Sequence, residues 1–195
     1  MKNIAVSVRA RLLNLSRETQ QSLDSLMEQY AMGRFLDRLA NSPYRERFVL
    51  KGAQLFRIWG ADLHRPTRDL DFLGYGESTE QAIRKIFTEL IELAVDPPDG
   101  LEWGEVKTGA IRDDVRYGGV RAVLTVNLAG ARLSLQIDVG FGDIVTPEAC
   151  ERQWQSLLGF PAARLLTYPP ETVIAEKLEA AVSLGGGFFP VKMLE

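Results

Sequence analysis

The spacing of apolar residues divides the first part of the chain into helical stretches. From Leu23 to Leu39, apolar side chains recur every three or four positions, which predicts one helix from about residue 17 to residue 40, ended by Asn41-Ser42-Pro43. Ser16 stands directly before this stretch as a candidate N-cap. Residues 4–15 carry apolar positions among arginines and indicate a short helix or an extended arm. A further amphipathic helix is predicted from residue 77 to about 94.

Five runs in the middle of the chain have the composition of strands. Gly52 provides a turn after the first run, and the apolar residues 55–59 predict two turns of helix behind it. The turn residues 129–131 between the last two runs indicate a hairpin. This order of elements predicts a mixed α/β sheet flanked by helices rather than a doubly wound sheet. The predicted strands are residues 48–51, 69–73, 101–111, 120–128 and 132–139.

The last third of the chain has weaker patterns. Residues 144–167 show little periodicity and are predicted to wrap around the sheet as loop and short helix. Pro170 then begins a helix, since proline is favoured in the first helical turn. The stripe of this helix that is predicted to be buried consists of Val173, Ile174, Leu178 and Ala181.

Two carboxylates in the second predicted strand form a candidate metal site. Alternate strand residues share a face, so Asp69 and Asp71 point the same way while Leu70 and Phe72 face the core. Carboxylate pairs suit Mg²⁺, which takes oxygen ligands and is commonly shared with substrate phosphates. In a chain with 26 acidic residues such a pair is weak evidence alone. The apolar strand strengthens it, because unpaired carboxylates are costly to bury.

Two further features adjoin this pair in the predicted sheet. The turn at Gly52 precedes a helix and could bring backbone N–H groups close to a phosphate, although most such glycines are plain turns. Asp138 alternates with Ile137 and Val139, and from the pattern alone it is either a strand-end residue that caps a turn or part of the site. Asp143 is interpreted as a turn residue.

Composition limits the classes of function. The 195 residues are 46% hydrophobic, which is ample for one packed domain with or without a small helical annex. A net charge of −3 is not that of a protein that coats nucleic acid, so RNA contact requires a local basic patch. The single cysteine, Cys150, excludes an internal disulfide. Without a signal peptide or an apolar run of membrane-spanning length, we expect a cytoplasmic protein with no membrane contact.

Several ordered segments resemble one known family. Residues 48–53 and 65–71 are similar to the signature of the AbiEii/AbiGii family, whose members are nucleotidyltransferase-fold toxins of bacterial type IV toxin–antitoxin systems related to the MenT toxins. Residues 30–42, 137–143 and 168–178 extend the resemblance up to about Leu184. It implies a nucleotidyltransferase (DNA polymerase β-like) fold with an N-terminal helical segment at 1–42, a nucleotidyltransferase domain at 43–184 and an irregular, truncated tail at 185–195.

The resemblance also implies roles for individual residues. It makes Asp138 a third carboxylate beside Asp69 and Asp71, so that these three are the expected Mg²⁺ ligands. It also makes Lys177 a nucleotide contact and catalytic residue, although a helical lysine is more often a solvated surface charge. The alternative for Arg65 and Arg68 is ion pairing with nearby acids. The expected nucleotide-binding residues are Lys51, Gly52, Ala53, Arg65, Thr67, Arg68 and Lys177.

The activity implied by the resemblance is Mg²⁺-dependent transfer of a nucleoside monophosphate from an NTP to an acceptor. The expected acceptor is RNA, in particular the 3′ end of tRNA, and the expected protein partner is a cognate antitoxin. No aspartate follows Asp143, so a later aspartate motif of the family is missing. We therefore expect Mg²⁺–NTP binding with weak transfer.

Two alternatives remain open at this stage. A metal-dependent phosphohydrolase or nuclease could use the same carboxylates, but it does not require the glycine turn before them. A non-catalytic nucleotide-binding module could keep the fold without the chemistry. Ala53 favours this second alternative, because the family more often has glycine or serine there.

Overall fold

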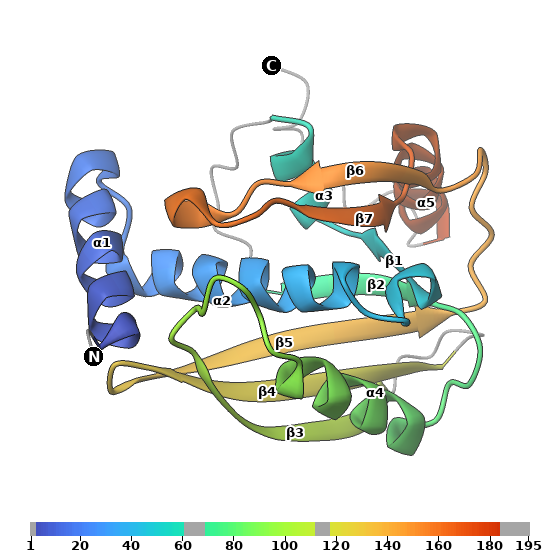
Figure 1. Cartoon of the computed structure of the whole chain (residues 1–195). Helices are drawn as coiled ribbons and strands as arrows, with labels where there is room; N and C mark the ends of the chain where they lie inside the picture. The colour runs from blue at the N-terminus through green and yellow to red at the C-terminus, as the bar shows by residue number, and fades with distance from the viewer. Residues whose placement is uncertain (1–2, 61–68, 112–117, 184–195) are drawn as a thin grey trace.

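The computed structural model describes residues 3–60, 69–111 and 118–183. Its strands form one seven-stranded sheet in the order β3-β4-β5-β2-β1-β7-β6 (Figure 1). The β2–β5 and β1–β7 pairs are parallel and the other neighbours are antiparallel, which confirms the predicted mixed sheet flanked by helices. The strands are β1 (Phe48–Lys51), β2 (Asp69–Gly74), β3 (Glu102–Ile111), β4 (Gly119–Leu128), β5 (Ala131–Phe141), β6 (Cys150–Trp154) and β7 (Ala163–Thr167). The α-helices are α1 (Ile4–Thr19), α2 (Leu23–Ala40), α3 (Gln54–Ile58), α4 (Glu80–Glu92) and α5 (Pro170–Ser183).

The main core lies between one face of the sheet and the helices α2 and α4, which lie in front of the sheet in Figure 1. Phe35 of α2 and Phe87 of α4 meet edge to face with ring centroids 5.4 Å apart. Phe48 of β1 packs against Phe87 and against Phe72 of β2, at centroid distances of 5.6 and 5.9 Å. The face of β2 that carries Phe72 is therefore the core face, and its other face points away from α2 and α4.

The N-terminal region contains two helices, so the prediction of one helix from 17 to 40 is wrong. Gln20 adopts a left-handed conformation (φ 58°) that ends α1, and Ser22 begins α2 by accepting a hydrogen bond from the Ser25 amide. Ser16, the predicted N-cap, lies inside α1 and donates to the carbonyl of Gln21. No apolar residue lies between Leu15 and Leu23, so apolar periodicity does not show where one helix ends and the next begins.

Two strands were missed in the region 144–167. Both β6 and β7 are only five residues long, and β6 pairs along its whole length with β7. Residues 151–153 of β6 are exposed and Trp154 is buried, so the strand shows no alternation of apolar and polar residues. Backbone pairing rather than side-chain pattern specifies this edge of the sheet. The short helix that was predicted in this region is a 3₁₀ turn at Leu157–Gly159.

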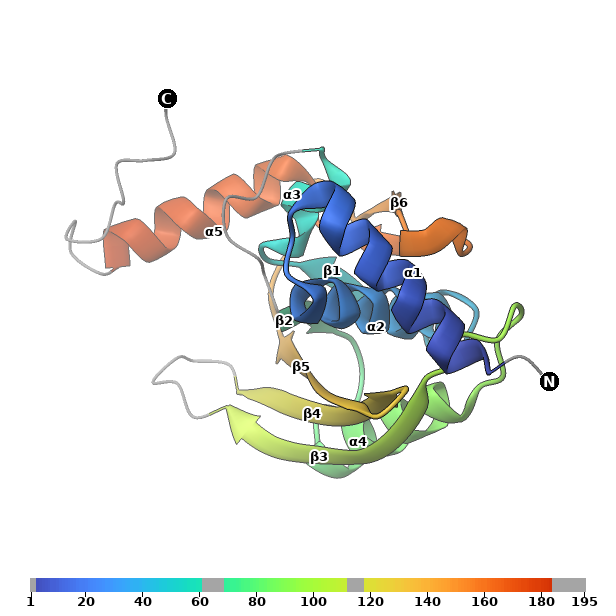
Figure 2. The ribbon, with the colours of Figure 1, turned by 90° about the vertical axis from the view of Figure 1, so that its left-hand side faces the viewer.

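Helix α5 begins at Pro170 as predicted, but its predicted stripe is not buried. Val173 is buried, whereas Ile174 and Leu178 are 59% and 54% exposed. The stripe is exposed because α5 extends away from the rest of the molecule, as Figure 2 shows. No helix within the described ranges has the length and hydrophobicity needed to cross a bilayer. The predicted tail at 185–195 lies outside the described residues, and the predicted domain boundaries stay predictions.

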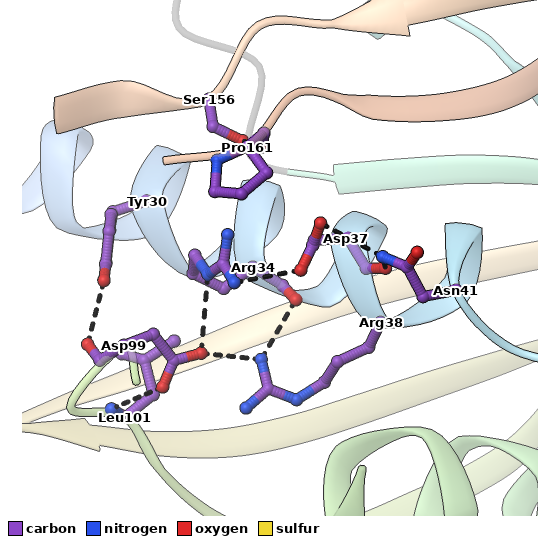
Figure 3. A network of polar contacts seen from close by, with 9 residues as sticks. All are labelled: Tyr30, Arg34, Asp37, Arg38, Asn41, Asp99, Leu101, Ser156 and Pro161. Carbon is purple, nitrogen blue, oxygen red and sulfur yellow. Dashed lines mark hydrogen bonds and ion pairs between the residues drawn. The ribbon is translucent and has the colours of Figure 1, made fainter. Parts of the chain in front are cut away.

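A buried polar network ties α2 to the segment before β3 (Figure 3). The fully buried Arg34 donates to Asp37 at 2.9 Å, and its Nε lies 3.5 Å from Oδ2 of Asp99. Arg38 donates to the same Asp99 oxygen at 2.6 Å, and Tyr30 donates to the Asp99 backbone carbonyl at 2.8 Å. Asp99 thus contacts two buried guanidinium groups. This shared partner explains why α2 carries arginines at buried positions.

Candidate active site

Strand β2 holds the two predicted aspartates on its non-core face. Leu70 and Phe72 are fully buried, whereas Asp69 and Asp71 are half-buried. The predicted alternation along this strand is therefore confirmed. Within the described ranges, neither carboxylate has a hydrogen bond or an ion pair of its own.

The glycine turn after β1 lies directly against Asp71. Gly52 has φ +74°, and a Cβ added to it would lie 2.1 Å from Oδ2 of Asp71. A side chain at this position would therefore both strain the backbone and collide with the carboxylate. Ala53 follows as the first flanking residue of α3 and has no side-chain capping bond. The turn thus brings backbone close to Asp71, as a phosphate cradle at this site requires.

Replacement of Gly52 by alanine is expected to destabilise the protein by about 1–3 kcal/mol, because it combines backbone strain with a steric clash. Gly130→Ala is the matched control, since Gly130 has φ +82° but nothing within 4 Å of the added Cβ. Urea unfolding of both variants separates the two effects. A larger loss for Gly52→Ala confirms the close approach to Asp71, and equal losses contradict it.

Strand β5 brings Asp138 next to the pair. In the parallel register of β2 and β5, Asp138 lies opposite Asp71. Arg121 of β4, the register partner of Asp138, donates from Nε and Nη2 to the two Asp138 oxygens at 2.8 and 2.7 Å. The sequence had given no reason to choose Arg121, since only the pairing of β4 with β5 places it beside the site.

The site carries an excess of negative charge. Burial, together with the nearby charges of Asp138 and Asp69, raises the pKa of Asp71 to about 6. Lys51 and Lys177 act in the opposite direction and lower this pKa, so both ammonium groups are electrostatically coupled to Asp71. Lys177 of α5, an exposed residue, therefore lies close enough to Asp71 to influence it.

The Asp69–Asp71 pair fits a hard divalent cation, because its carboxylates are half-buried, share a face and form no ion pair with any residue of the described ranges. A ready-made set of three ligands is not present: the described residues contain no group of three histidine, cysteine, aspartate or glutamate side chains that could hold a metal ion. The nearby Asp138 has both of its oxygens engaged by Arg121. A cation bound by the pair needs further oxygens from a substrate or water.

Lys51, the last residue of β1, lies at the centre of a second polar cluster. It is the register partner of Asp71, and its Nζ lies 2.5 Å from Oδ2 of Asp143 and 3.7 Å from Oε1 of Glu176. Tyr168 donates to the same Asp143 oxygen at 3.0 Å. Asp143 thus binds Lys51 in addition to lying in the turn after β5, and sequence analysis missed this contact.

Three of the predicted nucleotide-binding residues cannot be placed. Arg65, Thr67 and Arg68 lie outside the described residues. The other predicted site residues that the structure describes gather around one end of β2: Asp69, Asp71, Asp138, Lys51, Gly52 and Lys177. Their chemical roles stay predictions.

Comparison with known proteins gives one family match and two structural matches. The family model of the nucleotidyl transferase AbiEii toxin of type IV toxin–antitoxin systems matches residues 34–187. A crystal structure of a candidate nucleotidyltransferase from H. pylori is similar with a TM-score of 0.51 and 19% identity, covering 80% of this chain and 59% of that one. JHP933 from Helicobacter pylori is similar with a TM-score of 0.53 and 20% identity, covering 85% of this chain and 60% of that one.

These likenesses confirm the predicted nucleotidyltransferase fold. The chain spans 59% and 60% of the two solved structures. No match is found among curated proteins.

Proposed function

Because the chain belongs to the AbiEii nucleotidyl transferase toxin family of type IV toxin–antitoxin systems, we propose that it transfers a nucleoside monophosphate from an NTP to an RNA acceptor. The observation that carries this proposal is the convergence of the Asp69–Asp71 pair, the Gly52 turn and two lysines at one end of β2. Carboxylates that hold a cation and cationic groups that hold a triphosphate are the parts that nucleotidyl transfer needs.

Each part has a distinct role in the proposed reaction. Asp69 and Asp71 would hold Mg²⁺, which when bound neutralises charge on the triphosphate and on the leaving pyrophosphate. The backbone at Gly52 and Ala53 would approach the phosphates, and Lys177 would contribute a compact positive charge. Asp138 would orient the attacking hydroxyl, accept its proton or complete the cation ligands, while Arg121 fixes its direction.

The acceptor and the protein partner follow from the family rather than from the site. A toxin has to modify a molecule that the cell needs, and we propose the 3′ end of tRNA as that acceptor. A cognate antitoxin is the corresponding partner.

The proposal is tested by incubating the protein with Mg²⁺, total RNA and each of the four NTPs labelled at the α-phosphate. We expect label to appear in RNA with at least one NTP and to disappear when EDTA removes the divalent cation. RNA that stays unlabelled with all four nucleotides contradicts the proposal.

Lys177→Ala is expected to weaken NTP binding by about ten- to a hundredfold, because a charge-assisted contact contributes on the order of 1.5–3 kcal/mol. Lys107→Ala is the control, since Lys107 lies on β3 with a side chain that is 70% exposed and paired with Glu105 at 3.5 Å. Calorimetric titration with each NTP measures the nucleotide affinity of both variants. Equal affinities in the two variants would return Lys177 to an ordinary surface charge.

A further inference from the structure

Helix α5 carries Lys177 but has little apolar packing to hold it. Among its described side chains only Thr172 and Val173 are buried, and Ile174, Leu178 and Val182 are exposed. Figure 2 shows the helix leaving the body of the protein. An isolated helix of this length is marginal in water, so other contacts have to fix its direction.

Polar contacts supply two fixed points on one face of α5. Thr172 donates to the backbone carbonyl of Thr146 at 2.9 Å and accepts from the amide of the same residue at 3.2 Å. One turn later, Glu176 lies 3.7 Å from the ammonium of Lys51. Residues four apart lie on the same side of a helix. Contacts at both positions therefore fix the direction and the rotation of α5, and with them the place of the adjacent Lys177.

Lys51 is itself held firmly. Its Nζ contacts Asp143 at 2.5 Å and lies 5.6 Å from the ring centre of Tyr168, whose hydroxyl donates to the same Asp143 oxygen. Tyr168 is fully buried, so this arrangement is anchored in the core. An ammonium group has three donor positions, and two carboxylates surround this one. Little of the Lys51 charge is left for a triphosphate.

We propose that Lys51 is a positioning residue that acts on the nucleotide through Lys177, rather than a direct phosphate ligand. It joins the end of β1 to α5 through Glu176, with Asp143 and Tyr168 as its support. The inference rests on the proposed function, in which Lys177 contacts the triphosphate. It replaces the direct nucleotide contact that the family resemblance implies for Lys51.

A double-mutant cycle separates the two roles of Lys51. Binding of ATP, CTP, GTP and UTP with Mg²⁺ is measured for the wild type, Lys51→Met, Lys177→Ala and the double variant. We expect Lys51→Met to weaken binding by about tenfold in the wild type but by less than about twofold when Lys177 is already absent. An equal loss in both backgrounds shows a direct ligand and overturns the inference.

For Glu176→Gln, simple electrostatics and the proposed contact with Lys51 predict opposite changes in nucleotide affinity. The substitution removes a negative charge near the site, so simple electrostatics predicts tighter nucleotide binding. Loss of the contact with Lys51 instead predicts weaker binding, by several-fold. This side chain is 40% exposed, so we expect the variant to fold. Tighter binding by Glu176→Gln overturns the inference.

Hydrogen exchange of the amides at 171–183 tests the contact between Lys51 and α5 in the absence of nucleotide. Lys51→Met and Glu176→Gln should speed exchange along α5, and Lys85→Met should not, because Lys85 pairs with Glu89 on the separate helix α4 at 4.0 Å. Unchanged exchange in the first two variants overturns the inference even if the protein transfers nucleotides. If the wild type binds none of the four NTPs, the proposed function fails and the role through Lys177 fails with it, whereas faster exchange still shows that Lys51 holds α5.

Discussion

Asp71→Asn is expected to reduce nucleotide transfer at least about 1000-fold, corresponding to about 4 kcal/mol in the barrier, while making the folded protein more stable at neutral pH. The loss of transfer follows from the removal of one of the two carboxylates that fit the cation. The gain in stability follows from the raised pKa of Asp71, about 6 in the folded protein against an ordinary value of 3.8. A buried charge that its surroundings disfavour is removed by the substitution.

The pH dependence of this gain has a defined sign. At about pH 4 or below, the folded protein holds Asp71 mostly protonated, and its charge costs little. As the pH rises from 3.8 to about 6, the unfolded chain ionises before the folded protein does, so this group lowers the stability of the fold. The gain on substitution should therefore be on the order of 1–3 kcal/mol at pH 7 and should shrink towards zero near pH 4.

Urea unfolding at pH 7 and pH 4, in the absence of divalent cations, measures this difference. Glu105→Gln is the control, because Glu105 is an exposed carboxylate on β3 and its loss should change stability by less than about 0.5 kcal/mol. A variant Asp71→Asn that is less stable than the wild type at pH 7 would contradict the excess of negative charge in the site. Full transfer activity in the folded variant would show that Asp71 is not part of the active site.

Asp99→Ala is expected to destabilise the fold by about 3–5 kcal/mol, which is the usual result of removing one partner from a buried ion pair. Asp99 lies beside two buried guanidinium groups, those of Arg34 and Arg38, and it also accepts from the amide of Leu101 at 3.1 Å (Figure 3). Without its carboxylate, the charge of two arginines inside α2 is poorly compensated, since Asp37 remains as the partner of Arg34 alone.

Thermal and urea unfolding of Asp99→Ala and Asp99→Asn measure this effect. The asparagine variant keeps an oxygen that can accept from Leu101 and loses only the charge, so it should be less destabilised than the alanine variant. The matched surface control is Glu92→Ala at the end of α4, which should be nearly neutral. A loss below about 1 kcal/mol for Asp99→Ala would show that the network contributes little to stability.

The sequence pattern was sufficient where burial alternates clearly. In β2 the alternation of aspartates with Leu70 and Phe72 specifies both the strand and the face of the two carboxylates. The β4–β5 hairpin followed from its turn residues, and Gly52 was identified as a turn before the structure showed its approach to Asp71. Local periodicity and turn chemistry thus predict the strands that carry the site.

The contacts that surround these carboxylates depend on register and on distant segments, which no local pattern reports. Arg121 meets Asp138 because β4 pairs with β5, and Asp143 meets Lys51 across 92 positions of the chain. The break at Gln20 escaped the pattern because residues 16–22 are all polar and carry no apolar spacing. The exposure of Ile174 escaped it because apolar spacing is the same in a packed helix and in a projecting one.

The position of the transferred phosphate tests the central claim most directly. The protein is incubated with Mg²⁺, RNA and the active NTP labelled either at the α-phosphate or at the γ-phosphate. Nucleotidyl transfer predicts that α-label enters RNA and that γ-label leaves as pyrophosphate in equal amount. It also predicts that the Asp71→Asn variant neither labels RNA nor releases pyrophosphate. Release of γ-label as inorganic phosphate with no α-label in RNA would identify a phosphohydrolase and contradict the account.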